Sequence, residues 1–168
     1  MTDNQRQLSL LTSKATYIFD LDGTLADIRK RLSLANKGEE MDWSEFFNPD
    51  YIKYDKPKDD VINMARIIYE EGFNVVIFSG RLDTTREKTI EWLDNHSVDY
   101  HALIMRPQAT DEFTNDAVLK ERWLEELVDT RLSGHMGLIW GVYDDRNQVV
   151  DMWRSKGLTC YQVAKGDF

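Results

Sequence analysis

The sequence has 168 residues, 42% of them hydrophobic, and a formal net charge of -9. One substantial core is possible at this length, so we expect a single domain over residues 1–168. The acidic balance argues against a broad basic groove for nucleic acid, and no apolar stretch approaches the ~20 residues of a membrane span. With its polar start, the sequence predicts a cytoplasmic protein without a membrane partner. The single Cys160 excludes an internal disulfide and predicts a buried, inert thiol.

Residues 1–14 show no clear hydrophobic period, and we expect a frayed lead-in or a short helical turn. Residues 15–25 form an apolar, β-branched and aromatic run that is interrupted by Asp20, Asp22 and Gly23. Such a run is typical of a parallel strand buried on both faces, and ligands bind beyond the carboxyl ends of such strands. Two acids at this spacing suit metal binding and acid–base chemistry. The alternative is an ordinary Asp-rich turn.

The next segment, approximately residues 26–56, predicts a small cap insertion. Residues 27–35 fit a short helix with a basic face. On this helix Arg31 either leans over the crevice or belongs to a solvated charge run, and these residues alone favour the second interpretation. The aromatic side chains of the segment are Trp43, Phe46, Phe47, Tyr51 and Tyr54. Such rings can stack on nucleobases, but the helical spacing of the first three favours a stripe that packs the cap.

The rest of the chain alternates helices and strands. Periodicity and turn residues predict helices over residues 58–72, 83–95, from 115 or 116 onward, and 147–156, and strands over 73–78, 102–105, 137–143 and 158–163. Thr84 or Asp83 is the expected cap of the helix over 83–95, and residues 106–115 are expected to form a polar loop. This order predicts an α/β fold with a doubly wound, Rossmann-like parallel sheet and a small cap insertion after the first strand.

Polar residues follow three of the predicted strands and one helix start. They are Asp20 and Asp22, then Ser79, Gly80 and Arg81, then Lys120, and finally Asp144, Asp145 and Arg146. Because parallel strands end at one edge of a sheet, we expect all of them around one crevice. Phosphoryl transfer needs a nucleophile, a metal and cations on the transferring oxygens, and a proton source for the leaving oxygen. Each need has a candidate in this set.

The ordered motifs resemble those of the haloacid-dehalogenase-like phosphatases: Asp-Leu-Asp-Gly-Thr after an apolar strand, Phe-Ser-Gly, a helix lysine, and Asp-Asp after another strand. Within that superfamily, residues 79–81, 116–121, 144–154 and 160–168 resemble the phosphatase domain of bacteriophage polynucleotide kinase/3′-phosphatases. The resemblance spans roughly residues 15–168. It implies a phosphatase site made by Asp20, Asp22, Arg31, Ser79, Arg81, Asp116, Lys120, Asp144 and Asp145. The chain has no Gly-x-x-x-x-Gly-Lys-Ser/Thr phosphate loop, so the family's kinase activity is not implied.

The combined prediction is a Mg²⁺-dependent phosphomonoesterase that acts through an aspartyl-phosphate. Asp20 is the expected nucleophile. Asp22 is expected to protonate the leaving oxygen and then to activate water. Mg²⁺ prefers oxygen ligands, and we assign it Asp20, the backbone carbonyl of Asp22, and Asp145. Asp144 is expected to support the ion directly or through another ligand.

The remaining site residues are expected to hold the phosphate. The substrate-binding set is Arg31, Ser79, Gly80, Arg81 and Lys120, and Asp116 and Arg146 are supporting residues. Lys120 and Ser79 contact the transferring oxygens in this prediction, while the Arg81 guanidinium makes forked contacts. The weaker alternative for Lys120 is an i,i+4 ion pair with Asp116 alone.

The expected substrate is a terminal 3′-phosphate on DNA or RNA, and no obligate protein partner is inferred. If the gene is phage-encoded, the expected location is the host cytoplasm. A nucleotidase for nucleoside monophosphates is the nearest alternative, since an acidic protein favours a small ligand. A more distant alternative is a receiver-type phospho-acceptor module. Receivers place their acidic pair before the phosphorylated Asp, whereas Asp144 and Asp145 come last here.

Overall fold

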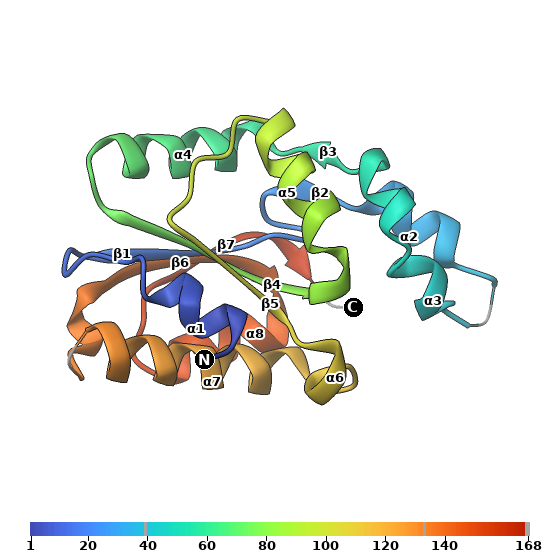
Figure 1. The fold of residues 1–168 in the computed structure, drawn as a ribbon. Helices are drawn as coiled ribbons and strands as arrows, with labels where there is room; N and C mark the ends of the chain where they lie inside the picture. The colour runs from blue at the N-terminus through green and yellow to red at the C-terminus, as the bar shows by residue number, and fades with distance from the viewer. Residues whose placement is uncertain (39, 133, 167–168) are drawn as a thin grey trace.

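A computed structural model describes residues 1–38, 40–132 and 134–166 (Figure 1). Five strands form one sheet in the order β5-β4-β1-β6-β7. They are β1 (Thr16–Asp20), β4 (Asn74–Leu82), β5 (Ala102–Arg106), β6 (Ile139–Arg146) and β7 (Cys160–Gly166). Every neighbouring pair is parallel. The predicted parallel α/β sheet is therefore confirmed.

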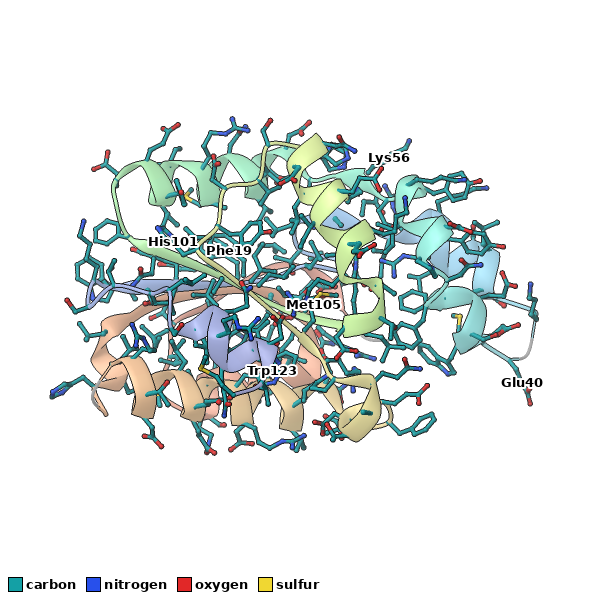
Figure 2. The ribbon with its side chains drawn as sticks, viewed as in Figure 1. Phe19, Glu40, Lys56, His101, Met105 and Trp123 are labelled. Atoms are coloured by element: carbon teal, nitrogen blue, oxygen red, sulfur yellow. The ribbon has the colours of Figure 1, made fainter. Side chains whose placement is uncertain are left out.

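Helices cover both faces of the sheet. On one face lie α1 (Asp3–Leu8), α7 (Asp116–Arg131) and α8 (Asn147–Ser155), and on the other lie α4 (Asp59–Glu70) and α5 (Arg86–Asn95) (Figure 1). Side chains alternate along β1, so Ile18 joins the first hydrophobic core and Phe19 the second. Figure 2 shows Phe19 and Trp123 on opposite sides of the sheet. Burial on both faces explains the unbroken apolar run of β1.

The strand order distinguishes the predicted Rossmann-like phosphatase fold from the receiver-type alternative. Numbered along the chain, the five sheet strands lie in the order 3-2-1-4-5. This is the Rossmann order, whereas receiver domains have the order 2-1-3-4-5. The receiver alternative is therefore wrong. The direction of winding reverses between β1 and β6, so the ligand crevice is expected beyond the carboxyl ends of these two strands.

Residues 26–57, which we call the helical insertion, lie at one end of the sheet (Figure 1). The segment opens with β2 (Ala26–Asp27) and closes with β3 (Lys56–Pro57), and these two strands pair antiparallel. Between them are α2 (Arg29–Ala35), α3 (Trp43–Phe46) and the 3-10 helix η1 (Pro49–Tyr54). The paired strands bring both ends of the insertion back to the same place, so it projects from the sheet without interrupting it.

Several element boundaries differ from the prediction. Of the two alternatives for the first residues, the short helical turn is confirmed by α1 and the frayed lead-in is wrong, because Asn4 exchanges hydrogen bonds with the backbone of Met105 on β5. The predicted polar loop contains the short helix α6 (Gln108–Asp111), and β6 begins two residues late, after the 3-10 helix η3 (Met136–Leu138). Within the described residues, no helix is long and apolar enough to cross a membrane.

The start of α5 also differs from the expectation. A 3-10 turn, η2 (Asp83–Thr85), leads into the helix, and no side chain caps it. The Asp83 carboxylate instead accepts a hydrogen bond from the Gln108 backbone N–H at 3.1 Å. This contact ties the end of β4 to the start of α6, so both predicted cap assignments are wrong.

Candidate active site

Three carboxylates, which we call the acidic cluster, lie together where the winding of the sheet reverses. Asp20 ends β1, and Asp144 and Asp145 lie near the end of the adjacent β6. One oxygen from each lies within 4.8 Å of the others, and all three residues are buried. The parallel pairing of β1 with β6 produces this cluster, as the sequence predicted.

Lys120 reaches the cluster from the first turns of α7. Its Nζ donates to Asp20 Oδ1 at 2.6 Å and to Asp144 Oδ2 at 3.0 Å, and it lies 3.4 Å from Asp116 Oδ2. Burial alone would lower the Lys120 pKa, but these carboxylates outweigh it and raise the pKa well above its usual value. The lysine is therefore charged. The i,i+4 pair with Asp116 exists, but it is one contact among three.

The second oxygen of Asp20 has a different environment. Oδ2 is buried and has no hydrogen-bond partner among the described residues. Burial raises the Asp20 pKa well above its usual value, and the nearby Asp144 and Asp145 raise it further, against the effect of Lys120. A buried, unpaired carboxylate oxygen is costly unless a cation or substrate completes it. The donor set is all oxygen and acidic, which fits Mg²⁺.

Gly23 allows the loop after β1 to approach this cluster. Its φ is +95°, a conformation that side chains rarely adopt. A Cβ at this position would lie 2.2 Å from Asp145 Oδ2. The Thr24 hydroxyl donates to Asp145 Oδ1 at 3.4 Å. The glycine of the Asp-Leu-Asp-Gly-Thr motif therefore leaves room for the third carboxylate.

A second charged cluster, which we call the arginine cluster, lies beside the first and links the sheet to the helical insertion. It consists of Asp22, Arg31, Arg81 and Asp55. Asp22 Oδ1 accepts from Arg31 at 2.7 Å and from Arg81 at 2.6 and 2.8 Å. Arg31 is only 1% exposed, so its prediction as part of a solvated charge run is wrong. Burial alone would raise the Asp22 pKa, but the two guanidinium groups lower it to about 2.

The fourth member of this arginine cluster, Asp55, was missed by the sequence analysis. Its Oδ2 accepts from Arg31 at 2.8 Å and from Arg81 at 2.7 Å, and its side chain is fully buried. Burial and the nearby Asp22 raise its pKa to about 6, against the effect of the arginines. Trp92 on α5 fixes the backbone by donating to the Asp55 carbonyl at 3.0 Å. Asp55 follows Tyr54 outside any predicted element, and no motif marks it.

Asp116 forms a third contact group with Gly80 and Arg106. The Arg106 guanidinium donates to Asp116 Oδ1 at 3.2 Å and to the Gly80 carbonyl at 2.9 Å. A Cβ on Gly80 would lie 2.7 Å from Asp116 Oδ1, so the glycine makes room for this carboxylate. Arg146 lies 4.0 Å from Asp116 Oδ2. Asp116 and Arg146 thus lie at the site, and Arg106 is a neighbour that the sequence analysis did not select.

A cavity of about 700 Å³ opens beside these groups. Asp20, Lys120 and Gly80 line it, as do Asp22, Asp116, Asp144, Asp145 and Arg146. In the part of the chain that the structure describes, the lining does not include Ser79, Arg31 or Arg81. Ser79 is fully buried, and its Oγ accepts from the Arg81 backbone N–H at 3.2 Å. These three predicted substrate-binding residues therefore lie behind the cavity wall.

The cavity continues onto the aromatic side chains of α3 and of the residue that follows it. Trp43 and Phe47 line it, and Trp43 is 55% exposed. Phe46 also lines the cavity but is buried, with the Arg31 guanidinium carbon 4.6 Å from its ring centroid. The predicted aromatic stripe does form, because the Trp43 ring contacts those of Phe46 and Phe47, but Trp43 itself is exposed rather than buried.

Two solved structures of one complex contain a chain that is similar to this protein. A chain in a solved Pnkp1/Rnl/Hen1 RNA repair complex is 31% identical, with a TM-score of 0.72, over 94% of this chain and 45% of that one. A second structure of the complex matches at 31% identity and TM-score 0.69, over 94% of this chain and 49% of the other. The chain thus spans about half the length of these relatives.

More distant structures share the fold. A structure described as a putative phosphatase from Clostridium difficile is 13% identical, with a TM-score of 0.62, over 89% of this chain and 84% of that one. The family model of the polynucleotide kinase PNKP phosphatase domain matches residues 14–168. This match covers the acidic cluster, the arginine cluster and the helical insertion. The chain therefore belongs to the PNKP phosphatase-domain family of haloacid-dehalogenase-like phosphatases.

Proposed function

We propose that the protein is a Mg²⁺-dependent phosphomonoesterase that removes terminal 3′-phosphates from polynucleotides through an aspartyl-phosphate. The observation that carries the chemistry is Asp20, whose Oδ1 is held by Lys120 while Oδ2 is buried without a partner. Lys120 fixes the carboxylate so that the other oxygen is the one available for attack. The family match supports phosphatase chemistry.

Asp20, Asp144 and Asp145 would hold the metal, together with the backbone carbonyl of Asp22. The bound ion supplies positive charge that offsets repulsion between the carboxylates and a phosphate dianion. The Asp20 carboxylate attacks phosphorus, and the bond to the leaving oxygen breaks. Water then hydrolyses the Asp20 acyl-phosphate and restores the carboxylate. Lys120 contacts the transferring oxygens throughout.

Asp22 is the proposed acid and base. It lines the cavity two residues beyond the nucleophile, so it is in position to donate a proton to the leaving oxygen. In this structure Arg31 and Arg81 keep it ionised. A phosphate dianion attracts the same guanidinium groups, and their movement toward it would release Asp22 for protonation. We therefore assign Arg31 and Arg81 to the phosphate-bound state, with Ser79 behind them.

The helical insertion is the proposed cap. It contributes Arg31 and Asp55 to the arginine cluster and aromatic rings to the cavity wall. Its short length leaves the crevice open to a strand terminus. A polynucleotide end is also supported by the relatives in an RNA repair complex. With a net charge of -9, contacts would be limited to the last few nucleotides.

A substrate panel with Mg²⁺ tests this proposal. We expect the highest kcat/KM on a 3′-phosphorylated oligonucleotide, lower values on nucleoside 3′-monophosphates, and the lowest values on 5′-phosphates. The salt dependence should be shallow, corresponding to roughly one to three neutralised phosphates. If shortening the oligonucleotide to a nucleoside 3′-monophosphate leaves kcat/KM unchanged and a 5′-monophosphate reacts faster, the nucleotidase alternative replaces this function.

A further inference from the structure

Two large aromatic side chains on the cavity are exposed. Trp43 comes from α3 in the helical insertion and is 55% exposed, while Phe113 precedes α7 and is 93% exposed. Both line the cavity that contains Asp20. Figure 1 shows α3 and α6, which lies just before Phe113, at the same end of the molecule. Single exposed apolar side chains are common on protein surfaces, so the informative observation is that both exposed rings line the same cavity as the nucleophile candidate.

The cavity is much larger than the reacting group. Its volume of about 700 Å³ is in the range of sites that hold drug-sized ligands, whereas a phosphate fills only a small part of it. In the proposed function, the carboxylates and Lys120 contact only the phosphate end of the substrate. The exposed aromatic rings line the same cavity and offer apolar contacts to the group that carries the phosphate.

The local cations have ionic partners already. Arg31 and Arg81 pair with Asp22 and Asp55, and Arg106 pairs with Asp116. Their charges are therefore largely balanced within the protein. Ionic contacts beyond the terminal phosphate would therefore be few, which leaves other contacts to bind the rest of the substrate. Every nucleobase has a π-face that can stack on an aromatic side chain.

We infer that Trp43 and Phe113 bind nucleobases at the phosphorylated end of the substrate by stacking. This inference rests on the proposed function and adds a specificity element to it. Stacking is tolerant of sequence, so the site would accept any terminal base but would distinguish a base from its absence. Trp43 is held for this role by Phe47, whose ring is stacked at a centroid distance of 6.2 Å.

The test compares two 3′-phosphorylated oligonucleotides, one with an ordinary terminal nucleotide and one with an abasic terminal nucleotide. Wild type is expected to prefer the ordinary end by about 5- to 100-fold in kcat/KM, the range that stacking provides. Phe113→Ala and Trp43→Ala should reduce this preference mainly through KM, and Trp43→Phe should retain much of it. Trp140→Ala is the matched control, because Trp140 is 52% exposed and does not line the cavity.

Equal rates of wild type on the two oligonucleotides would overturn the inference. Equal losses of each variant on both substrates would do the same, because they would indicate damage to the cap rather than a lost base contact. Failure of the proposed function gives a different result, namely wild type that hydrolyses nucleoside 5′-monophosphates better than either oligonucleotide. In that case the same variants on a nucleoside monophosphate and on ribose 5-phosphate decide whether the aromatic pair binds a base.

Discussion

The acidic cluster and the arginine cluster lie side by side, yet their charges are arranged in opposite ways. In the acidic cluster, Asp20, Asp144 and Asp145 lie together, and the single ammonium of Lys120 pairs with the first two of them. In the arginine cluster, two guanidinium groups meet two carboxylates, and each guanidinium contacts both of them. The first cluster carries excess negative charge, whereas the second is balanced.

This difference indicates two different tasks. A buried excess of negative charge is stabilised by binding a cation, so the acidic cluster is suited to a metal and to the reacting phosphate. A balanced buried cluster mainly fixes the positions of its side chains, because breaking it leaves a buried charge without a partner. Before substrate binds, the arginine cluster therefore joins the helical insertion to β4 and holds Asp22 at the cavity wall.

The largest expected effect comes from removing the nucleophile. Asp20→Asn should reduce phosphate release to below about 1% of wild type, because an amide is a poor nucleophile and a weaker metal ligand. Steady-state release of inorganic phosphate measures this. Asp151→Asn on α8 is the control, since Asp151 is exposed. Turnover well above that level in Asp20→Asn would exclude Asp20 as the nucleophile.

Metal removal tests the excess charge of the acidic cluster. Chelation should abolish activity, and added Mg²⁺ should restore it. Saturating Mg²⁺ should also raise the melting temperature of wild type by about 5 °C or more, because it binds the folded state only. Asp145→Asn should lose most of this shift. An equal shift in wild type and Asp145→Asn would place the ion elsewhere.

The role of Asp22 predicts a dependence on the leaving group. Asp22→Asn should reduce hydrolysis of an alkyl phosphate by about 100-fold or more, in the range of general acid–base contributions. The loss with p-nitrophenyl phosphate should be smaller in the first step, because that leaving group needs little protonation. Burst kinetics with both substrates separate the steps. Equal losses in the first step would contradict an acid role.

A smaller effect is expected from Asp55→Asn, which unbalances the arginine cluster. We expect the free energy of unfolding to fall by about 1–3 kcal/mol, because buried hydrogen bonds to two guanidinium groups are weakened. Activity should fall by about 10-fold through misplacement of Asp22 and its arginines. Denaturant unfolding and kcat/KM measure the two effects. The exposed Asp50→Asn in η1 is the control, and wild-type activity in Asp55→Asn would show that Asp55 has no positioning role.

A prediction that does not concern catalysis is made for Cys160, whose thiol lies near the acidic cluster. Burial raises the pKa of its thiol to about 12, and Asp144 adds to this rise. Since the thiolate is the reactive form, native protein should react with iodoacetamide at pH 8 at least about 100-fold more slowly than denatured protein. Rapid labelling of the native thiol would mean that the core beside Asp144 opens readily.

The sequence predicted the acidic cluster because each member follows a recognisable strand. Asp20, Asp144 and Asp145 end apolar runs, and a parallel sheet brings such ends together without further information. The strand order itself could not be predicted from the motifs, although the alternation of strand and helix gave the parallel sheet. Element ends were less accurate, as at Asp83, where a tertiary contact with Gln108 replaced the expected helix cap.

The arginine cluster was predicted only in part because its geometry depends on the helical insertion. Arg31 lies in a run of three basic residues, which favours a solvated face, but Asp55 and Asp22 together stabilise its burial. Asp55 lies 24 residues away in a segment without periodicity, so no local pattern pairs the two. The exposure of Trp43 was missed for another reason. Helical spacing does not distinguish a face that packs in the core from a face that lines a cavity.

The most direct test of the account is to identify the phosphorylated residue during turnover. Asp22→Asn protein mixed with Mg²⁺ and p-nitrophenyl phosphate is quenched in acid, digested and examined by mass spectrometry. We expect a phosphate adduct on the peptide that contains Asp20, and none when Asp20→Asn is added to the same protein. A phosphate adduct on Asp144 or Asp145, or turnover by wild type with no adduct at any quench time, would contradict it.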